Sequence, residues 1–270
     1  MADRDAAFIG AIPENYDRYL GPLFFHDYAA VMGARLEVTP GMLVLETACG
    51  TGIVTERLAA RLAGQGTLVA TDLNAPMLAY AAAKRSAGNI SWEEADATRL
   101  PFEDRAFDAV VCQFGLMFFT DKAAGVREAF RVLRPGGQFA LSVWDALEDN
   151  PVPRLTHETV TGFFPNDPPQ FYRVPFSLHD MTVVRGLLTS AGFDDVRGER
   201  VEGVGLSASA ADAAKGLIEG NPIYQAIMER RPTALADIEA AVAEKIAAAL
   251  GDRPLRCPLR AIFFSGRRPA

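Results

Sequence analysis

The residues with the clearest chemical meaning form a small-residue turn at positions 46–52, which reads Glu-Thr-Ala-Cys-Gly-Thr-Gly. Gly50 and Gly52 have no Cβ, so a ligand can approach the backbone closely there. A turn of this kind, between a strand and a helix, presents free backbone N–H groups to a bound ligand. A G-x-G pair alone fits a tight turn without a ligand equally well. The turn is therefore a candidate ligand site that needs support from other residues.

Two acidic residues supply that support. Asp72 follows the turn by about 20 residues at the end of the next apolar run, where a carboxylate can accept hydrogen bonds from both ribose hydroxyls. A helix N-cap is the alternative role for Asp72, but Asn74 is better placed as the cap. Asp96, followed by Ala97, ends a third run, where it can accept from an adenine amino group or form an Asx turn. Together with the turn, they predict an adenosine-containing cofactor.

The turn also separates two classes of cofactor. A dinucleotide-binding turn reads G-x-G-x-x-G/A, and its third small residue permits close packing beside a pyrophosphate. Thr55 stands at that position here, so the signature fails. This disfavours a nicotinamide-dependent oxidoreductase, which stays an alternative, as does a regulatory protein that binds the cofactor without catalysis.

The elements that must position these residues alternate along the first half of the chain. Short apolar runs predict five strands, at residues 42–45, 67–71, 90–95, 107–114 and 138–144. Helical patterns separate most of them, at residues 55–62, 75–87 and 121–133. Such alternation predicts an α/β fold with right-handed crossovers and a parallel sheet covered by helices on both faces.

The rest of the chain is predicted to add helices to this core within a single domain of 270 residues. The predicted divisions are an N-terminal helical segment at 1–38, the core at 39–144, cap insertions at 145–178 and 206–255, and the remaining core strands and helix at 179–205 and 256–270. Six prolines in 145–178 argue against a further helix–strand repeat there.

The composition excludes several classes of function. With 49% hydrophobic and 23% charged residues the chain is typical of globular proteins, and its net charge of −7 disfavours a nucleic-acid partner. Three widely spaced cysteines offer neither a disulfide framework nor a metal site, and no run approaches the roughly 20 apolar residues of a membrane helix. We therefore predict a cytoplasmic protein with a small-molecule partner and no metal, membrane or nucleic acid; a homodimer is left open.

The motifs resemble those of class I S-adenosylmethionine-dependent methyltransferases, most nearly the ubiquinone/menaquinone-biosynthesis-type and related small-molecule enzymes. The likeness is carried by residues 44–52, 72, 96–97, 100–108 and 133–137. It implies a Rossmann-like, doubly wound, seven-stranded sheet with an antiparallel last strand and an N-terminal helical lid. It also implies S-adenosyl-L-methionine as cofactor and methyl transfer to O, C or N of a small, apolar or aromatic metabolite. Glu46 departs from the family, which more often has Asp there, as does the pair Thr47-Ala48, where Val-Gly or Leu-Gly is usual.

The resemblance assigns roles residue by residue. It places the 46–52 turn beside the methionine moiety, Asp72 on the ribose, Asp96 and Ala97 at the adenine, and Gln113 near the sulfonium. The predicted cofactor-binding residues are Tyr16, Glu46, Ala48, Gly50, Thr51, Gly52, Asp72, Leu73, Met77, Asp96, Ala97 and Gln113.

A methyl group on a sulfonium is already electrophilic, so such an enzyme has to align the acceptor and exclude water, and a dedicated base is not essential. For a hydroxyl acceptor a histidine would serve as the base. Among His26, His157 and His179, we choose His157 as the catalytic candidate because it lies in the 145–178 insertion, where the family often places acceptor-binding residues. A surface or capping role is its alternative.

Aromatic residues are candidates for the walls of the site. Tyr16 and Tyr19 are three residues apart and would share one helix face, with core packing as the alternative to a place near the cofactor. An apolar acceptor pocket, or else buried core, is predicted for Phe24, Phe25, Phe163, Phe164, Phe171 and Tyr172.

Overall fold

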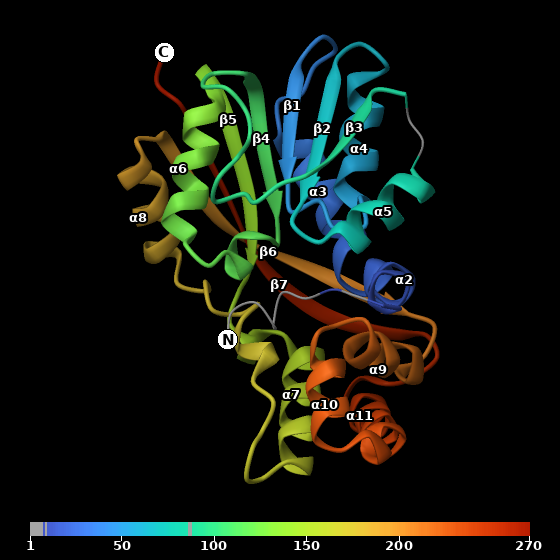
Figure 1. Ribbon diagram of the computed structural model, residues 1–270. Coiled ribbons are helices and arrows are strands. Elements are labelled where there is room, and N and C mark those ends of the chain that lie inside the picture. The colour runs from blue at the N-terminus through green and yellow to red at the C-terminus, as the bar shows by residue number, and fades with distance from the viewer. Residues whose placement is uncertain (1–7, 9, 86–87) are drawn as a thin grey trace.

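The computed structural model describes residue 8, residues 10–85 and residues 88–270, and centres on a seven-stranded sheet in the order β3-β2-β1-β4-β5-β7-β6 (Figure 1). The strands are β1 (Leu43–Thr47), β2 (Thr67–Asp72), β3 (Ile90–Glu94), β4 (Phe107–Gln113), β5 (Leu133–Trp144), β6 (Asp194–Ser207) and β7 (Leu255–Arg267). Strands β1 to β5 pair in parallel, whereas β7 is antiparallel to both of its neighbours, β5 and β6. The predicted α/β fold with an antiparallel last strand is confirmed.

Helices flank the sheet, with α4 and α5 on one side of it in Figure 1 and α6 and α8 on the other. The helices of the core are α3 (His26–Arg35), α4 (Ile53–Leu62), α5 (Ala75–Lys84), α6 (Lys122–Val132) and α8 (Met181–Ala191). In α4, Leu58 and Leu62, four residues apart on one face, are fully buried. The strands between these layers are buried from both sides, which explains the near-continuous apolar run of β4.

A second group of helices lies beyond the carboxyl ends of the parallel strands (Figure 1). It comprises α2 (Ile12–Asn15), the π-helix η1 (Tyr16–Phe25), α7 (Pro151–Phe163), α9 (Ala210–Glu219), α10 (Ile223–Arg230) and α11 (Leu235–Leu250). Short 3-10 turns complete the chain, at η2 (Leu116–Phe118), η3 (Leu147–Asp149), η4 (Phe171–Arg173) and η5 (Pro232–Ala234). The π-helix η1 packs closely on α9 at Gly216. A Cβ at this glycine would lie only 2.5 Å from the Cβ of Tyr19.

The start of β5 and the end of α5 differ from the predicted boundaries, whereas the helical cap insertion predicted at 145–178 does contain a helix. The strand predicted at 138–144 begins at Leu133, because the main chain of Gly136 and Gly137 is hydrogen-bonded to Arg268 beyond the end of β7. The proline-rich 145–178 segment contains the 13-residue helix α7, since Pro151 and Pro153 stand in its first turn, where a missing N–H costs no intrahelical bond. The helix predicted at 75–87 ends at Lys84, and residues 86–87 lie outside the described residues.

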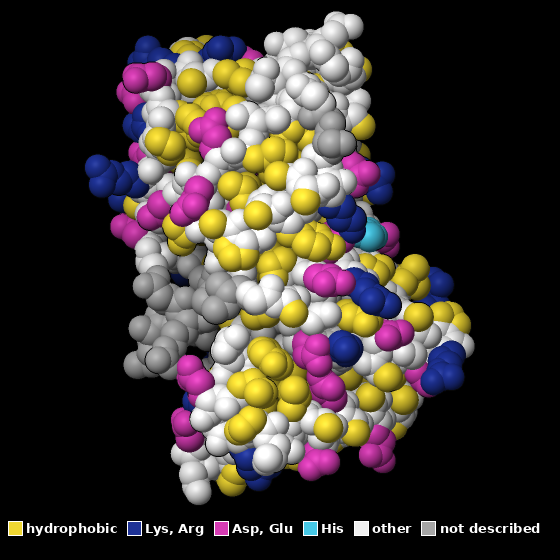
Figure 2. Space-filling view, turned by 45° about the vertical axis from the view of Figure 1, so that its right-hand side comes forward, with side chains coloured by type: hydrophobic (Ala, Val, Ile, Leu, Met, Phe, Trp, Pro, Cys, Tyr) yellow, Lys and Arg dark blue, Asp and Glu magenta, His cyan; other side chains and the backbone are white. Residues whose placement is uncertain are grey.

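The surface carries charges of both signs. On the face shown in Figure 2, Lys and Arg side chains are scattered among Asp and Glu, without a continuous basic stripe. Within the described ranges, none of the helices combines the length and apolar character needed to cross a membrane.

Candidate active site

The carboxyl ends of β1, β2 and β4 border a cavity of about 350 Å³, which we call the cofactor cavity. Nine of the twelve predicted cofactor-binding residues line it: Tyr16, Ala48, Gly50, Asp72, Leu73, Met77, Asp96, Ala97 and Gln113. The lining also includes residues that the sequence did not assign to the cofactor: Phe8, Asn74, Ala95, Thr98, Phe114, Gly115, Phe118, Phe119 and Thr120. Glu46, Thr51 and Gly52 are not on the wall.

The small-residue turn has left-handed backbone geometry at three positions, with φ of +53° at Ala48, +56° at Gly50 and +78° at Gly52. A Cβ on Gly50 would meet nothing within 4 Å, so its backbone is open to a ligand. Gly52 differs, because a Cβ there would approach Cδ of Arg85 at 2.8 Å and the Trp92 ring at 3.1 Å. Glycine is therefore needed at the two positions for different reasons. Gly50 leaves room beside the cavity, whereas Gly52 leaves room for the Arg85 side chain.

Asp72 is the ordered acid of the cavity, with only 6% of the residue exposed. Its Oδ2 accepts the Gly50 N–H at 2.8 Å, and its Oδ1 accepts both the backbone N–H of Asn74 at 2.8 Å and the Asn74 side-chain amide at 3.3 Å. Burial raises the pKa of Asp72, and these backbone donors oppose that shift. Asn74 occupies the cap position of α5 but makes no side-chain capping bond; its Oδ1 instead accepts the Phe8 N–H at 3.2 Å.

Thr51 Oγ1 in the turn and Thr55 Oγ1 just after it are buried without a hydrogen-bond partner in the described part of the chain. So are two oxygens at strand ends, Glu46 Oε2 of β1 and Gln113 Oε1 of β4. Glu46 is only 2% exposed, and this burial raises its pKa to about 8. Buried polar atoms in native proteins nearly always have a hydrogen-bond partner. These oxygens are therefore available to a ligand or to water.

At the other end of the cavity, Asp96 forms the Asx turn that was its alternative role. Its Oδ1 accepts the N–H of Thr98 at 2.8 Å and the hydroxyl of Thr98 at 2.7 Å. Asp96 is exposed and keeps Oδ2 available, so the turn orients the carboxylate without excluding contact with a ligand.

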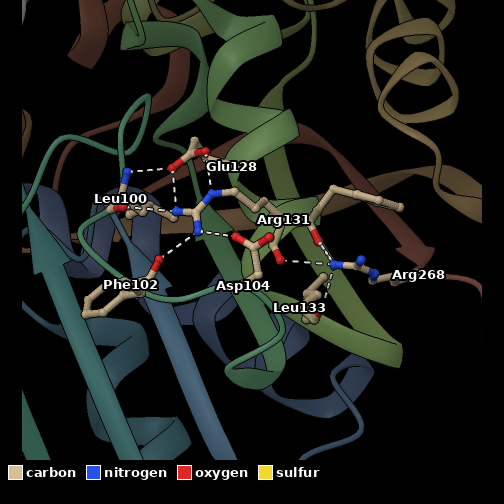
Figure 3. A network of polar contacts seen from close by, with 8 residues as sticks. Leu100, Phe102, Asp104, Glu128, Arg131, Leu133 and Arg268 are labelled. Atoms are coloured by element: carbon tan, nitrogen blue, oxygen red, sulfur yellow. Dashed lines mark hydrogen bonds and ion pairs between the residues drawn. The ribbon is translucent and has the colours of Figure 1, made fainter.

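An ion cluster fixes the loop that follows Asp96 (Figure 3). Arg131 of α6 donates to the carbonyls of Leu100 at 3.0 Å and Phe102 at 2.7 Å and to the Asp104 carboxylate at 2.8 Å. Glu128 accepts the Leu100 N–H at 2.7 Å and is paired with Arg131, whose hydrogen bond lowers the pKa of Glu128. This part of the cavity is therefore held by α6 rather than by local turn geometry alone.

A smaller cavity of about 50 Å³, the aromatic cavity, adjoins the first and shares four of its wall residues: Phe8, Tyr16, Phe114 and Phe118. The rest of its wall is Phe24, Phe25, Trp144, Asn150, Pro153, Phe171, Tyr172, Pro175, Phe176 and Asn221. Trp144 and Phe114 stack with ring centroids 4.1 Å apart. Among its described lining residues there is no Asp, Glu, Lys or Arg.

The aromatic cavity divides the predicted aromatic set. Phe24, Phe25, Phe171 and Tyr172 line it. Phe163 and Phe164 do not, and the guanidinium of Arg231 lies 5.8 Å and 5.6 Å from their ring centres.

Comparison with known proteins identifies this architecture. The methyltransferase domain family matches residues 44–137. The ubiquinone/menaquinone biosynthesis C-methyltransferase UbiE of Idiomarina loihiensis is 30% identical over 183 residues, which cover 62% of this chain and 72% of that protein. UbiE of Shewanella sp. (strain ANA-3) is 32% identical over 183 residues, covering 62% and 70%. The chain belongs to the class I S-adenosylmethionine-dependent methyltransferases of the ubiquinone/menaquinone-biosynthesis type.

The methyltransferase fold also agrees with a solved structure. Phosphoethanolamine N-methyltransferase 2 of Haemonchus contortus, in complex with S-adenosyl-L-methionine, superposes with a TM-score of 0.62 at 16% identity, covering 96% of this chain and 57% of that one. The chain is thus an enzyme that transfers a methyl group from S-adenosyl-L-methionine to a small molecule, and the two alternatives left open by the sequence are set aside.

The hydrogen-bond acceptors at this site fit S-adenosyl-L-methionine. An amino-acid ammonium offers three N–H donors. Gln113 Oε1 on the cavity wall is an unpartnered buried acceptor, and Glu46 Oε2, off the wall, is another. Asp72 has three of its roughly four acceptor positions in use, which leaves it able to accept from a ribose hydroxyl. The open backbone at Gly50 lies on the same cavity wall as Asp72 and Gln113.

None of the three histidines lines either cavity. His157 lies on α7 with its ring centre 6.4 Å from that of Tyr172, and burial lowers its pKa. His26 faces Gly21, and Nδ1 of His179 contacts the Phe176 carbonyl at 2.9 Å. His157 is therefore adjacent to a wall residue of the aromatic cavity rather than part of its wall.

The most important residues that the sequence reasoning missed follow β4. Phe114, with φ of +53°, and Phe118 of η2 form the shared wall of the two cavities. Their position directly after Gln113, at the carboxyl end of a central strand, was the available signal, because ligands of open α/β sheets bind at that edge.

Proposed function

We propose that this methyltransferase methylates a carbon atom of an uncharged, electron-rich aromatic ring that binds where the aromatic and cofactor cavities adjoin. The observation that carries the proposal is the wall of four aromatic residues common to the aromatic and cofactor cavities. Because the same rings line both cavities, an acceptor in one and the methyl donor in the other would bind side by side. The relatives, named as C-methyltransferases of ubiquinone/menaquinone biosynthesis, support carbon as the methylated atom.

The chemistry of the wall favours an uncharged acceptor. Aromatic rings bind another ring through stacked and edge-to-face contacts. A carboxylate or phosphate placed here would lose its hydration without meeting a cationic side chain among the described lining residues, which is strongly unfavourable. Discrimination against charged acceptors follows from the wall itself.

We further propose a division of labour among the predicted cofactor-binding residues. Asp72 binds the ribose hydroxyls, Asp96 and Ala97 bind the adenine, and Leu73 and Met77 pack beside the nucleoside. Gln113 and Glu46 accept from the methionine end, where Tyr16 covers the cavity. Ala48, Thr51 and Gly52 keep the turn in the geometry that exposes the backbone of Gly50.

When bound, the cofactor supplies a methyl group on a positively charged sulfur. The protein has to hold the acceptor carbon in line with that methyl group and exclude water. The carbon–methyl bond would form as the methyl–sulfur bond breaks, with the electron pair of the broken bond left on the sulfur, and the ring would then lose its proton to water. Since His157 is off both cavity walls, we propose that the electron density of the ring, rather than a histidine, provides the nucleophile. A His157→Gln variant tests this against the prediction that His157 is a base.

A methyl-transfer assay with ¹³C-methyl-labelled S-adenosylmethionine tests the acceptor class. The acceptors are hydroxylated aromatic compounds and their carboxylated counterparts, and NMR of the product locates the methyl group. We expect ring-carbon products, with kcat/KM lower by at least a hundredfold for each carboxylated counterpart. Products methylated only on oxygen or nitrogen, or a preference for the charged member of a pair, would overturn the proposal.

Two matched phenylalanine variants locate the acceptor. Phe171→Ala removes a wall ring and is expected to raise the acceptor KM about tenfold. Phe163→Ala removes a ring outside the wall and is expected to leave that KM within twofold. Equal effects of the two variants would place the acceptor elsewhere.

The division into a lid (1–38), a core (39–144 with 179–205 and 256–270) and caps (145–178 and 206–255) is proposed on the same basis. The lid and cap segments supply most of the aromatic cavity, whereas the strands of the core end at the cofactor cavity. The homodimer left open by the sequence stays a prediction, which light scattering checks.

A further inference from the structure

The π-helix η1 carries a buried carboxylate to which the methyl-transfer chemistry gives no role. The Asp17 side chain is only 3% exposed, and its Oδ2 contacts the ammonium of Lys84. Nη2 of Arg85 lies 3.5 Å from Oδ1 of Asp17, and the hydroxyl of Tyr80 donates to Oδ2 of Asp17 at 3.4 Å. Burying a carboxylate is unfavourable unless such partners compensate it. All three partners belong to α5 or directly follow it, so the cluster joins η1 to one specific helix.

Helix α5 connects this cluster to the cofactor cavity. Its first turn and the residues before it place Leu73, Asn74 and Met77 on the cavity wall, directly after Asp72. In its last turns, Tyr80 and Lys84 are four residues apart and so share a face, which points at Asp17. Figure 1 shows α2, the start of the lid, close to α5, and the two are in contact. Asp17 thus fixes the lid with respect to the ribose-binding acid.

The residue before Asp17 is the cover of the cavity. Tyr16 lines both cavities, and its ring stacks on Phe25 at 4.8 Å and meets Phe8 edge-on at 5.7 Å. It is the first residue of η1, and π-helical segments are frequent at functional sites. A shift of η1 away from α5 would carry Tyr16 off the cofactor cavity.

Arg85 extends the cluster to the glycine turn. Its side chain is 8% exposed, and its Cδ lies 2.8 Å from where a Cβ on Gly52 would be. One end of Arg85 therefore covers the small-residue turn while the other reaches the lid carboxylate. The lid, the turn and α5 meet at Asp17 and Arg85.

We propose that Asp17 is a positioning residue that holds Tyr16 over the cofactor cavity and thereby sets the rate at which S-adenosylmethionine and S-adenosylhomocysteine exchange. The inference rests on the proposed placement of the cofactor in this cavity. Opening of the lid is then a slow step of turnover, and its rate depends on the Asp17 carboxylate, which lies outside both cavities.

The test compares Asp17→Asn with Glu14→Gln, which removes the same charge from an exposed position on the same segment. Dissociation of S-adenosylhomocysteine is followed by stopped-flow tryptophan fluorescence, together with kcat, the KM for S-adenosylmethionine and thermal melting. For Asp17→Asn we expect at least tenfold faster dissociation and a KM raised to a similar extent, with kcat unchanged or higher. Glu14→Gln is expected to stay within twofold of the wild type, and Asp17→Glu to restore dissociation to within threefold.

Dissociation and KM within twofold of the wild type in a folded Asp17→Asn variant would overturn the proposal, even if melting changed. If that variant does not fold, Lys84→Gln takes its place, because Lys84 is 49% exposed and its loss is more easily tolerated. At least threefold faster dissociation is then expected, and an unchanged rate overturns the proposal. Asp72→Ala in the same assay distinguishes the cofactor placement from the role of Asp17. Full cofactor affinity in Asp72→Ala refutes the cofactor placement. Loss of cofactor affinity in Asp72→Ala, together with unchanged kinetics in Asp17→Asn, refutes the role of Asp17 alone.

Discussion

Replacing Asp72 by Asn is the most direct test of the cofactor site. Each oxygen of the carboxylate accepts a backbone N–H, from Gly50 on one side and Asn74 on the other, both at 2.8 Å. An Asn side chain of the same size turns one oxygen into an NH₂ group, which then faces a donor. The loss of a charge-assisted hydrogen bond costs about 1.5–3 kcal/mol of the free energy of unfolding.

Cofactor affinity should fall on the same scale. Each bond between a ribose hydroxyl and the Asp72 carboxylate is worth about 1.5–3 kcal/mol. Losing one such bond weakens binding by roughly 10- to 150-fold. The assay is isothermal titration calorimetry with S-adenosylhomocysteine, combined with urea denaturation of the ligand-free protein.

Asp96→Asn is the matched control. Asp96 is exposed, and an Asn retains the Oδ1 that accepts both bonds from Thr98. We expect a change in the free energy of unfolding below about 0.5 kcal/mol. The expected loss in cofactor affinity, from about 0.5–1.5 kcal/mol, is roughly 2- to 12-fold. A folded Asp72→Asn protein that binds within threefold of the wild type, or a larger affinity loss in Asp96→Asn, would refute the assignment.

Two further predictions concern stability. Burial raises the pKa of Glu46 from 4.5 to about 8. The contribution of Glu46 to the free energy of unfolding is therefore complete below pH 4.5 and is lost as the pH rises through 8. Urea titrations of the ligand-free protein should show this decline, and Glu46→Gln should remove it. Arg131→Leu should lower the free energy of unfolding by about 2–3 kcal/mol, because it frees the carbonyls of Leu100 and Phe102 and leaves Glu128 unpaired. Its KM for S-adenosylmethionine should rise about tenfold in the methyl-transfer assay, and an unchanged KM would show that the 100–104 loop does not shape the adenine end.

The core of the fold could be predicted because its signals are local. Apolar runs of strand length end in a small-residue turn, Asp72 or Asp96, and each end falls at the same sheet edge. The beginning of β5 was missed because a residue distant in sequence decides it, whereas the helical character of 145–178 was predicted without the bounds of α7. Arg268 hydrogen-bonds the glycines of β5, and α7 tolerates its prolines only because they stand in the first turn.

The candidate site shows the same division. Gly52 was predicted to make room for a ligand, but Arg85, 33 residues later, is what occupies the space beside it. Phe163 and Phe171 have the same side chain in the same segment, yet only Phe171 faces the aromatic cavity. Composition shows that aromatic residues are present, whereas the packing of η4 against α7 and α9 decides which of them face the cavity.

The wall between the two cavities has a thermodynamic consequence. Phe8, Tyr16, Phe114 and Phe118 each face both sides, so a ligand that displaces one of these rings changes the surface that the other ligand meets. The factor by which the cofactor alters acceptor affinity must equal the factor by which the acceptor alters cofactor affinity. The binding of the methyl donor and that of the acceptor are therefore coupled. Substitutions chosen to change the acceptor preference will also change the affinity for the methyl donor.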